Sequence, residues 1–238
     1  MTDALDRPVA KRPDGLRSPG PWSRLRELRL GIDLPRYAWH TREVLGAPSG
    51  DGRTVMLVPG FKTTDRSLVP LRTFLGSRGH HARDWGFGVN NGDVDGLLER
   101  TKERVVELAE RSGRPINLVG WSLGGVYARE SARDHPEHVH RVATMGTPLF
   151  GPRHTIGHSF YSEDELTRID GQIDERSAEP IRRPVLAIYS RNDGIVDWRA
   201  CPDTETPDAR NVEVASGHVG MGLDPTVWRR IADFFAAD

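Results

Sequence analysis

Cysteine is nearly absent from the sequence, and long apolar runs do not occur. Cys201 is the only cysteine among 238 residues, so no disulfide can form within the chain and its stability does not depend on an oxidising compartment. No eighteen apolar residues follow one another, and the first twenty residues hold no apolar run of signal-peptide length. These absences predict a cytoplasmic protein without a stable membrane anchor.

An excess of charge of one sign is absent as well. The 33 basic and 34 acidic residues give a formal net charge of -1. Such a chain has no bulk electrostatic attraction to nucleic acid or to anionic membranes. We therefore expect a small-molecule partner and no nucleic acid, while the sequence leaves the oligomeric state open.

The chain divides into a polar beginning and one longer domain. Residues 1–21 are poor in apolar side chains and are predicted to form a flexible tail, and residues 22–238 are predicted to form a single domain. Trp22–Leu30 places apolar residues at three-residue spacing, which predicts a short amphipathic helix lying on that domain. The polar stretch 149–181 interrupts the later rhythm and is predicted to be a small helical cap.

Short apolar runs alternate with longer helical patterns from Thr54 onward. This alternation predicts an α/β fold in which helices cover both faces of a mostly parallel sheet. The predicted strands are Thr54–Val58, Ile116–Val119, Val139–Met145 and Val185–Tyr189. The predicted helices are Asp95–Ser112, closed by Gly113, then Val126–Arg133 and Thr226–Ala237.

The sequence GWSLGG follows the second predicted strand directly and leads into a helical pattern. It places Ser122 in a G-x-S-x-G motif with the strand, turn and helix context that exposes a serine hydroxyl at a helix N-terminus. Glycines flank the serine because a Cβ there would collide with a neighbouring strand or helix. The alternative, a glycine-rich turn with only a structural role, explains the glycines but not the serine. Ser122 is therefore the candidate nucleophile.

A serine nucleophile needs a base and a carboxylate that orients the base. Asp193 follows the strand Val185–Tyr189, and His218 lies in SGHVG shortly before the final helix, in the order serine, acid, histidine. Asp197 competes for the role of the acid, and Asp193 has an alternative role as a turn former. His218 has the alternative of a structural loop histidine.

The oxyanion hole is predicted to combine the backbone N–H groups of Leu123 and Phe61, the latter in the Pro59-Gly60-Phe61 turn after the first strand. A simple strand-ending turn is the alternative for Phe61. Asn90 and Asn91 are expected to shape a loop near the site. The clustered histidines lack the carboxylate or cysteine that would complete a metal set, so no metal is predicted.

Five motifs together resemble the bacterial esterase and lipase branch of the α/β-hydrolase superfamily. They are GWSLGG, PGF, Gly146-Thr147-Pro148, Asp193 in SRNDG and His218 in SGHVGM, and the likeness covers roughly residues 54–235. The resemblance implies a Ser-His-Asp triad, no cofactor, and an oxyanion loop similar to that of enzymes acting on medium or long acyl chains. Secreted lipases of this branch usually carry an export signal, which is missing here and disfavours extracellular triglyceride digestion.

The predicted function is hydrolysis of carboxylic esters through an acyl-enzyme on Ser122. Trp121, Phe160 and Tyr161 are candidate substrate-binding residues, although each has core or cap packing as the alternative. An acyltransferase, thioesterase or peptidase with the same triad stays open. A hydrolase-fold protein that binds without turnover is the alternative from another class.

Overall fold

The computed structural model describes residues 13–29, 31, 33, 37, 40, 42, 44–177 and 179–237. Six parallel strands form one sheet in the order β2-β1-β3-β4-β5-β6. The strands are β1 (Thr54–Val58), β2 (His81–Asp84), β3 (Ile116–Trp121), β4 (Val139–Met145), β5 (Val185–Tyr189) and β6 (Ala209–Glu213). The chain passes from β1 to β2 at one edge of the sheet and then crosses back past β1 to β3. The first two crossovers therefore lead towards opposite edges of the sheet. The central strands are buried over most of their length, as their continuous apolar sequence requires.

Five α-helices and several 3-10 helices connect or flank the strands among the described residues. The α-helices are α2 (Val69–Ser77), α3 (Val94–Ser112), α4 (Leu123–Asp134), α5 (Glu163–Ser177) and α6 (Pro225–Ala236). The 3-10 helices are η1 (Pro21–Arg29), η2 (Asp65–Leu68), η3 (Pro152–His154), η4 (Ile156–Phe160), η5 (Trp198–Ala200) and η6 (Val219–Leu223). Gly113 ends α3 in the left-handed conformation, as predicted.

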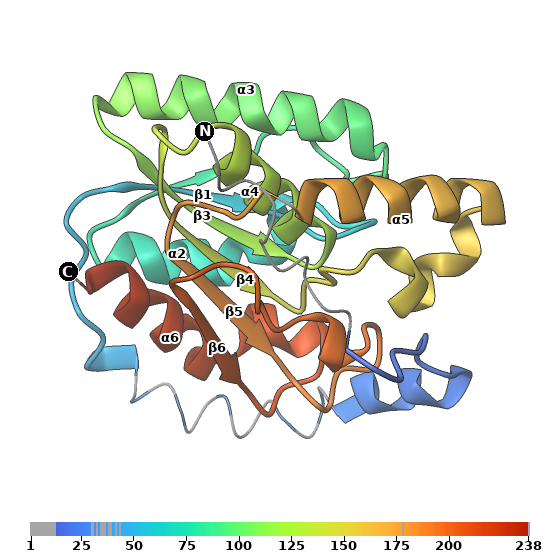
Figure 1. Cartoon of the computed structure of the whole chain (residues 1–238). Coiled ribbons are helices and arrows are strands. Elements are labelled where there is room, and N and C mark those ends of the chain that lie inside the picture. Colours follow the sequence, from blue (N-terminus) through green and yellow to red (C-terminus); the bar gives the residue numbers. More distant parts are fainter. Residues whose placement is uncertain are drawn as a thin grey trace, which may run out of the picture.

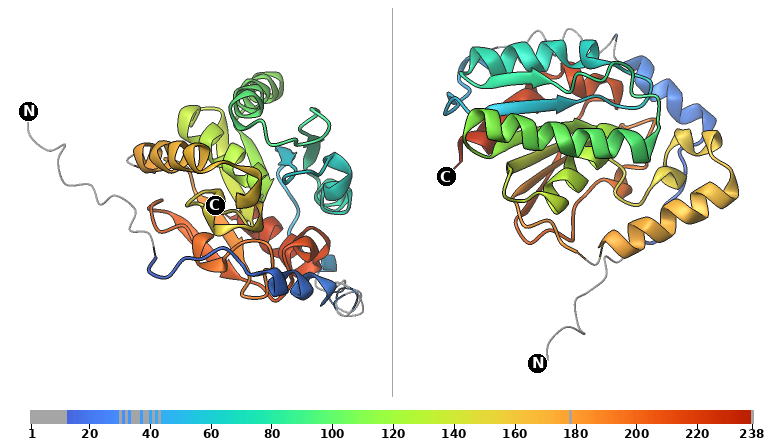
Figure 2. Two further views of the ribbon diagram at one scale, coloured as in Figure 1. Left: turned by 90° about the vertical axis from the view of Figure 1, so that its right-hand side faces the viewer. Right: turned by 90° about the horizontal axis from the view of Figure 1, so that it is seen from above.

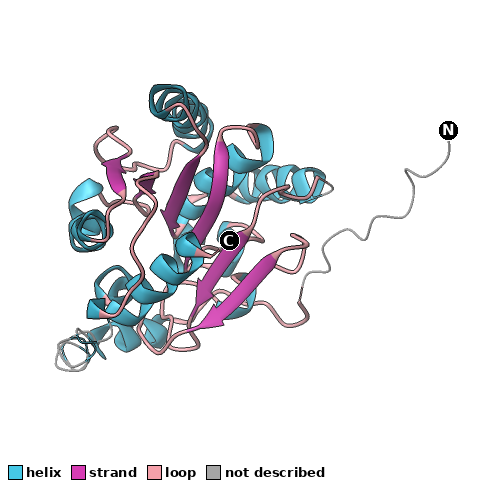
Figure 3. Ribbon diagram, turned by 90° about the vertical axis from the view of Figure 1, so that its left-hand side faces the viewer, coloured by secondary structure: helices cyan, strands magenta, loops and turns pink. Residues whose placement is uncertain are grey.

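The sheet is the middle of three layers (Figure 1, Figure 3). On one face, Leu71 and Leu75 of α2 and Ile231 of α6 pack with inward-facing strand residues in one apolar cluster. On the other face, Val105 of α3 and Tyr127 of α4 pack in a second cluster. The predicted sheet covered by helices on both faces is confirmed.

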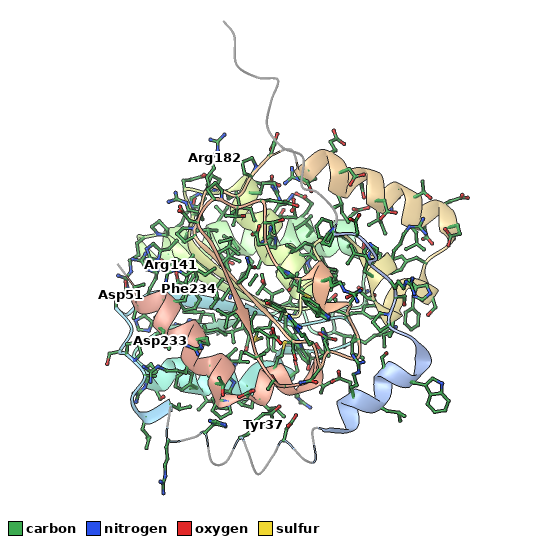
Figure 4. All side chains as sticks on the ribbon, turned by 60° about the horizontal axis from the view of Figure 1, so that its bottom comes forward. Tyr37, Asp51, Arg141, Arg182, Asp233 and Phe234 are labelled. Carbon is green, nitrogen blue, oxygen red and sulfur yellow. The ribbon has the colours of Figure 1, made fainter. Side chains whose placement is uncertain are left out.

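A polar contact joins the start of β4 to the end of α6. The buried Arg141 guanidinium donates a hydrogen bond of 2.6 Å to the carbonyl of Phe234 and lies 5.3 Å from the centre of that ring (Figure 4). The arginine thereby satisfies a carbonyl in the last turn of α6, where helical partners run out. The contact holds the C-terminal helix against the sheet.

The two edge strands were not predicted from the sequence. β2 has the sequence HARD and β6 the sequence ARNVE, and both consist of exposed and half-buried residues with no fully buried one. Edge strands of a parallel sheet face solvent and do not need continuous apolar character, so the apolar signal that identifies central strands is missing.

The N-terminal helix is present and contacts the domain, but the prediction that its apolar side chains make this contact is wrong for Trp22 and Leu25. Trp22 and Leu25 of η1 are 79% and 53% exposed. The helix contacts the domain through polar groups instead, as with the Ser23 hydroxyl, which donates to the Gly194 carbonyl at 2.9 Å. In the part of the predicted tail that is described, the backbone N–H of Arg17 donates to the Asp197 carboxylate.

The stretch predicted to be a cap holds η3, η4 and α5 between β4 and β5. Figure 2 shows α5 on the same side of the molecule as η1. Arg176 of α5 forms ion pairs with Glu130 and Asp134 of α4, so the far end of α5 is tied to the helix that follows Ser122. Arg153 of η3 pairs with Asp170 of α5 at 2.6 Å.

Candidate active site

Ser122 lies in the turn between β3 and α4, in a conformation that few non-glycine residues adopt. Its φ and ψ are 53° and -123°, and its backbone N–H donates to the Met145 carbonyl of β4 at 2.8 Å. A positive φ at a serine is strained and persists only where the surrounding structure enforces it. The turn places the hydroxyl at the N-terminus of α4, where free N–H groups and the helix dipole favour negative charge.

Two glycines around Ser122 make this tight turn sterically possible. A Cβ on Gly120 would lie 2.3 Å from the Gly125 Cα, and a Cβ on Gly124 would lie 2.3 Å from the Val58 carbonyl oxygen of β1. Both distances are far below van der Waals contact. The glycines predicted from the motif are therefore required by the helix on one side and by the strand on the other.

His218 and Asp193 are brought together although they come from different loops. The Nδ1 atom of His218 lies 2.6 Å from Asp193 Oδ2, and both side chains are almost completely buried. The other carboxylate oxygen, Oδ1, accepts hydrogen bonds from the backbone N–H groups of Ile195 and Val196 at 2.8 and 2.7 Å. Asp193 is thus fixed by its own loop and presents its second oxygen to the imidazole.

The competing carboxylate, Asp197, is occupied elsewhere. It caps η5 through the backbone N–H of Arg199, pairs with the guanidinium of the same residue at 3.1 Å, and accepts from the backbone N–H of Arg17. The carboxylate hydrogen-bonded to the His218 imidazole is that of Asp193 and not that of Asp197. The geometry therefore favours Asp193 as the partner of the imidazole.

The imidazole lies near both the serine turn and the loop after β4. Its ring centre is 5.9 Å from that of Trp121, the residue before Ser122. A Cβ on Gly146, which has a φ of 56°, would lie 2.8 Å from His218 Nδ1 and 3.2 Å from Asp193 Oδ2. In the part of the chain that is described, no hydrogen bond joins the Ser122 hydroxyl to the His218 ring.

The electrostatic surroundings favour the protonated form of His218. Burial by itself lowers the pKa of this imidazole, but the Asp193 carboxylate beside Nδ1 and the Glu27 carboxylate outweigh burial and raise the pKa above its usual value. An imidazolium is thereby stabilised at this position. A group that accepts a proton from a serine hydroxyl requires this property.

The loop after β1 lies against the serine turn. A Cβ on Gly60 would lie 3.3 Å from the Ser122 Cβ. Among the described residues, no hydrogen bond occupies the backbone N–H groups of Phe61 and Leu123, whereas Lys62, the residue after Phe61, donates to the Asn90 carbonyl. An oxyanion site needs two such free donors near the nucleophile.

Comparisons with known proteins agree with this architecture. No family model matches the chain. A pimeloyl-[acyl-carrier protein] methyl ester esterase of Shewanella woodyi is 26% identical over 141 residues, which cover 58% of this chain and 53% of the relative, so the match spans about half the length of that curated relative.

Two solved structures share the fold. Lipase B of Aspergillus fumigatus superposes with a TM-score of 0.60 at 16% identity, over 78% of this chain and 53% of that one. A monoacylglycerol lipase of Paleococcus ferrophilus superposes with a TM-score of 0.58 at 18% identity, over 79% of this chain and 96% of that one. The chain has the α/β-hydrolase fold. The resemblance that the five motifs predicted is confirmed.

In this hydrolase fold, a cavity of about 600 Å³ begins at Leu123 and runs between α3, α4 and α5. Leu98 of α3, Val126 of α4 and Ile169 of α5 line it together with Leu123. These residues form an apolar strip beside the serine turn. Charged groups line the rest of the cavity, among them Asp93, Asp95, Lys102, Arg129, Arg133, Glu165, Arg168 and Arg176.

The three aromatic residues predicted to bind substrate lie in different places. Tyr161 lines the cavity. Trp121 is buried against His218, and Phe160 is 67% exposed with its ring centre 5.5 Å from that of Phe61. Substrate contact stays a prediction for all three.

Asn90 holds the loop that carries Phe61, which confirms the expectation that it shapes a loop near the site. Its fully buried side chain donates to the Pro59 carbonyl at 2.9 Å, and its backbone exchanges hydrogen bonds with Lys62 and Thr63. In the sequence, this role was indicated only by a pair of asparagines between glycines.

We expect Asn90→Ala to lower kcat/KM for an ester by roughly 10-fold to 100-fold, because a loosened loop displaces the Phe61 N–H. Steady-state kinetics with p-nitrophenyl butyrate measure the effect. Asn91→Ala is the matched control, since its side chain is exposed and accepts from the backbone N–H of Asp93, within the same loop. Equal losses in both variants would contradict this role of Asn90.

The described residues contain neither a cluster of metal-binding side chains nor a membrane-spanning helix. Among the described residues, no group of three or more His, Cys, Asp or Glu side chains is arranged to hold a metal ion. None of the described helices combines the length and the apolar character needed to cross a membrane.

Proposed function

We propose that this protein is a serine hydrolase that cleaves carboxylic esters, with Ser122 as the nucleophile, His218 as the base and Asp193 as the acid that orients the base. The observation that carries the proposal is the buried hydrogen bond of 2.6 Å between Asp193 and His218, beside a serine held at a positive φ at a helix N-terminus. The fold shared with esterases and lipases supports it.

In the proposed reaction, the Ser122 hydroxyl attacks the ester carbonyl while His218 takes its proton at the ring nitrogen opposite Asp193. The negative oxygen of the tetrahedral intermediate is stabilised by the N–H groups of Leu123 and Phe61. His218 then passes the proton to the departing alcohol. Water, activated by the same histidine, releases the acid from the acyl-enzyme and restores Ser122.

The cavity supports a substrate with an apolar chain of medium length. Its apolar part begins at Leu123, next to the nucleophile, and continues along the face of α4 that holds Val126. Ten residues of helix separate Leu123 from Arg133, a rise of about 15 Å, so this arginine lies well away from the serine. An acyl chain that enters the cavity can pack along the apolar strip of Leu98, Val126 and Ile169.

A rate profile across p-nitrophenyl esters from acetyl to palmitoyl, with one thioester, tests the proposal. We expect kcat/KM to peak at medium chain length and the oxygen ester to exceed the thioester of the same acyl group. No turnover of any ester by folded protein would reject the proposal. A preference for the thioester would favour the alternative of a thioesterase with the same triad.

Enlarging the side chain at Val126 tests whether the cavity holds the chain. We expect Val126→Phe to lower kcat/KM for the octanoyl ester by roughly 10-fold to 100-fold, because the new ring excludes several methylene groups from apolar contact. The acetyl ester is expected to react at an almost unchanged rate.

Val106→Phe on α3 is the matched control, because this half-buried residue does not line the cavity. It is expected to leave the ratio of octanoyl to acetyl rates unchanged. A Val126→Phe variant with the chain-length profile of the wild type would place the acyl chain elsewhere.

A further inference from the structure

The η1 helix lies across the two loops that hold Asp193 and His218. Besides the hydrogen bond from Ser23 to the Gly194 carbonyl, the Arg26 guanidinium donates to the Arg191 carbonyl at 3.3 Å. A Cβ on Gly194 would lie 2.3 Å from the Ser23 carbonyl oxygen. Only glycine at position 194 permits this close approach, so the acid loop is shaped to receive the helix.

One carboxylate of η1 connects both loops. Glu27 Oε1 accepts hydrogen bonds from the backbone N–H groups of Gly194 and His218 at 2.8 and 3.0 Å. Its second oxygen, Oε2, accepts from the backbone N–H of Val219 at 2.8 Å. Gly194 directly follows the acid, and His218 is the base itself. The same carboxylate therefore fixes the backbone on both sides of the Asp193 to His218 hydrogen bond.

The base loop is also shaped around this carboxylate. A Cβ on Gly217 would lie 3.0 Å from Glu27 Oε2 and 3.3 Å from its Cδ, so a larger residue would displace the carboxylate. Hydrogen bonds from N–H groups to a charged acceptor are about twice as strong as neutral ones. Glu27 makes three of them, one to the acid loop and two to the base loop, so it fixes the two loops relative to each other.

The charged groups that act on the imidazole come from two elements. Asp193 of the acid loop and Glu27 of η1 both raise the pKa of His218 against the effect of burial. The other neighbours of the ring, Trp121 at the end of β3 and Gly146 after β4, carry no charge. Glu27 is thus, besides Asp193, a negative group that acts on the imidazole, and its carboxylate lies against the backbone N–H of His218.

We propose that Glu27 is a positioning residue for the reaction: its carboxylate holds the acid loop and the base loop at the spacing that keeps Asp193 on His218 and orients the imidazole towards Ser122. This inference rests on the proposed function, because it assigns Glu27 a role in that same site. Glu27 does not touch the reacting atoms. It acts through the backbone of His218 and of the residue after Asp193.

Glu27→Gln in the full chain tests the proposal. The substitution nearly preserves shape, removes the negative charge, and leaves one of the two oxygen positions occupied by an NH2 group that cannot accept. We expect kcat for p-nitrophenyl butyrate to fall roughly 10-fold to 100-fold, with KM changed less than about 2-fold. The loss in kcat follows from a misplaced base and not from weaker substrate binding.

The pH profile separates positioning from simple attachment of the helix. His218 must be neutral to accept a proton, so the acidic limb of kcat/KM follows its pKa. Glu27 raises this pKa, so its loss lowers the pKa and moves the acidic limb to lower pH. Loss of an attachment that carries no charge, as in Ser23→Ala, changes at most the height of the profile and leaves the limb in place.

Two control variants complete the experiment. Glu110→Gln makes the same substitution on the exposed side of α3 and is expected to leave kcat and the acidic limb unchanged. Ser23→Ala removes a hydrogen bond between the same helix and the same loop without changing charge, and is expected to leave the limb unchanged. Thermal melting of each variant shows that the domain is folded at the assay temperature.

An NMR titration of the His218 imidazole, in wild type and in Glu27→Gln, gives a measurement that needs no turnover. A lower imidazole pKa in Glu27→Gln shows that Glu27 acts on His218 even if the wild type hydrolyses no ester, in which case only the proposed function fails. An active wild type whose kcat, acidic limb and imidazole pKa are all unaffected by Glu27→Gln overturns the inference and leaves the proposed function intact. A kcat loss equal to that of Ser23→Ala, with an unmoved limb, also overturns it.

Discussion

Replacing Ser122 by alanine is expected to reduce ester hydrolysis by roughly five to six orders of magnitude, because no other group in the proposed site can form the acyl-enzyme. The oxyanion donors and the cavity remain in such a variant, so a small rate above that of water is expected to persist. Steady-state assays with p-nitrophenyl butyrate, at protein concentrations high enough to detect this remainder, measure the loss.

The fold is expected to survive this substitution. The backbone N–H of Ser122 keeps its hydrogen bond to the Met145 carbonyl, and alanine is no larger than serine. A circular dichroism melt close to that of the wild type provides the control. An intact Ser122→Ala protein that hydrolyses esters at the parent rate would remove Ser122 from the mechanism.

The second large effect is expected at Asp193. We expect Asp193→Asn to lower kcat by about 10⁴-fold, because an amide NH2 facing Nδ1 favours the wrong tautomer of the imidazole. Asparagine Oδ1 is able to accept from Ile195 and Val196 as the carboxylate does, so the loop is expected to keep its conformation. Measuring kcat together with KM distinguishes this loss from weaker binding.

Asp197→Asn is the matched control, since both aspartates lie in the same loop and both are buried. Asp197 caps η5 and pairs with Arg199, so its substitution is expected to lower stability slightly and kcat by no more than a few-fold. The reverse ranking of the two variants would assign the orienting carboxylate to Asp197.

The central strands could be predicted because burial on both faces leaves a continuous apolar signature. β1, β4 and β5 begin and end at the predicted residues, and β3 extends two residues further, to Trp121. Gly120 is one of those two residues. It has no apolar side chain, so the apolar pattern ends before it, although the strand continues through it. The serine turn could be predicted because its glycines lie in a short motif directly after a strand. Gly120 is required by the helix that follows it, and Gly124 by Val58 of β1.

Contacts between distant segments left no such local pattern. Glu27 is the only acidic residue of η1, but nothing in PWSRLRELR shows that its carboxylate reaches backbone groups near residues 194 and 218. The apolar spacing of Trp22 and Leu25 predicted that the apolar face of η1 contacts the domain, whereas the contact is made by polar groups. Such polar contacts depend on which segments lie close together in the folded chain, and the local sequence does not show this. The edge strands β2 and β6 were missed because their polar sequences carry no apolar signal.

The choice between Asp193 and Asp197 shows where sequence reasoning ends. Both follow β5 within a few residues, and only the position of the imidazole distinguishes them. The cytoplasmic location and the absence of nucleic-acid partners stay predictions.

The central claim is that Ser122 is a nucleophile activated by His218, and fluorophosphonate labelling followed by mass spectrometry of the peptides tests it most directly. The account predicts one adduct, on Ser122, formed in the wild type and lost in a folded His218→Ala variant. Folded wild type that forms no adduct, or an adduct on another residue while Ser122 stays unmodified, would contradict it.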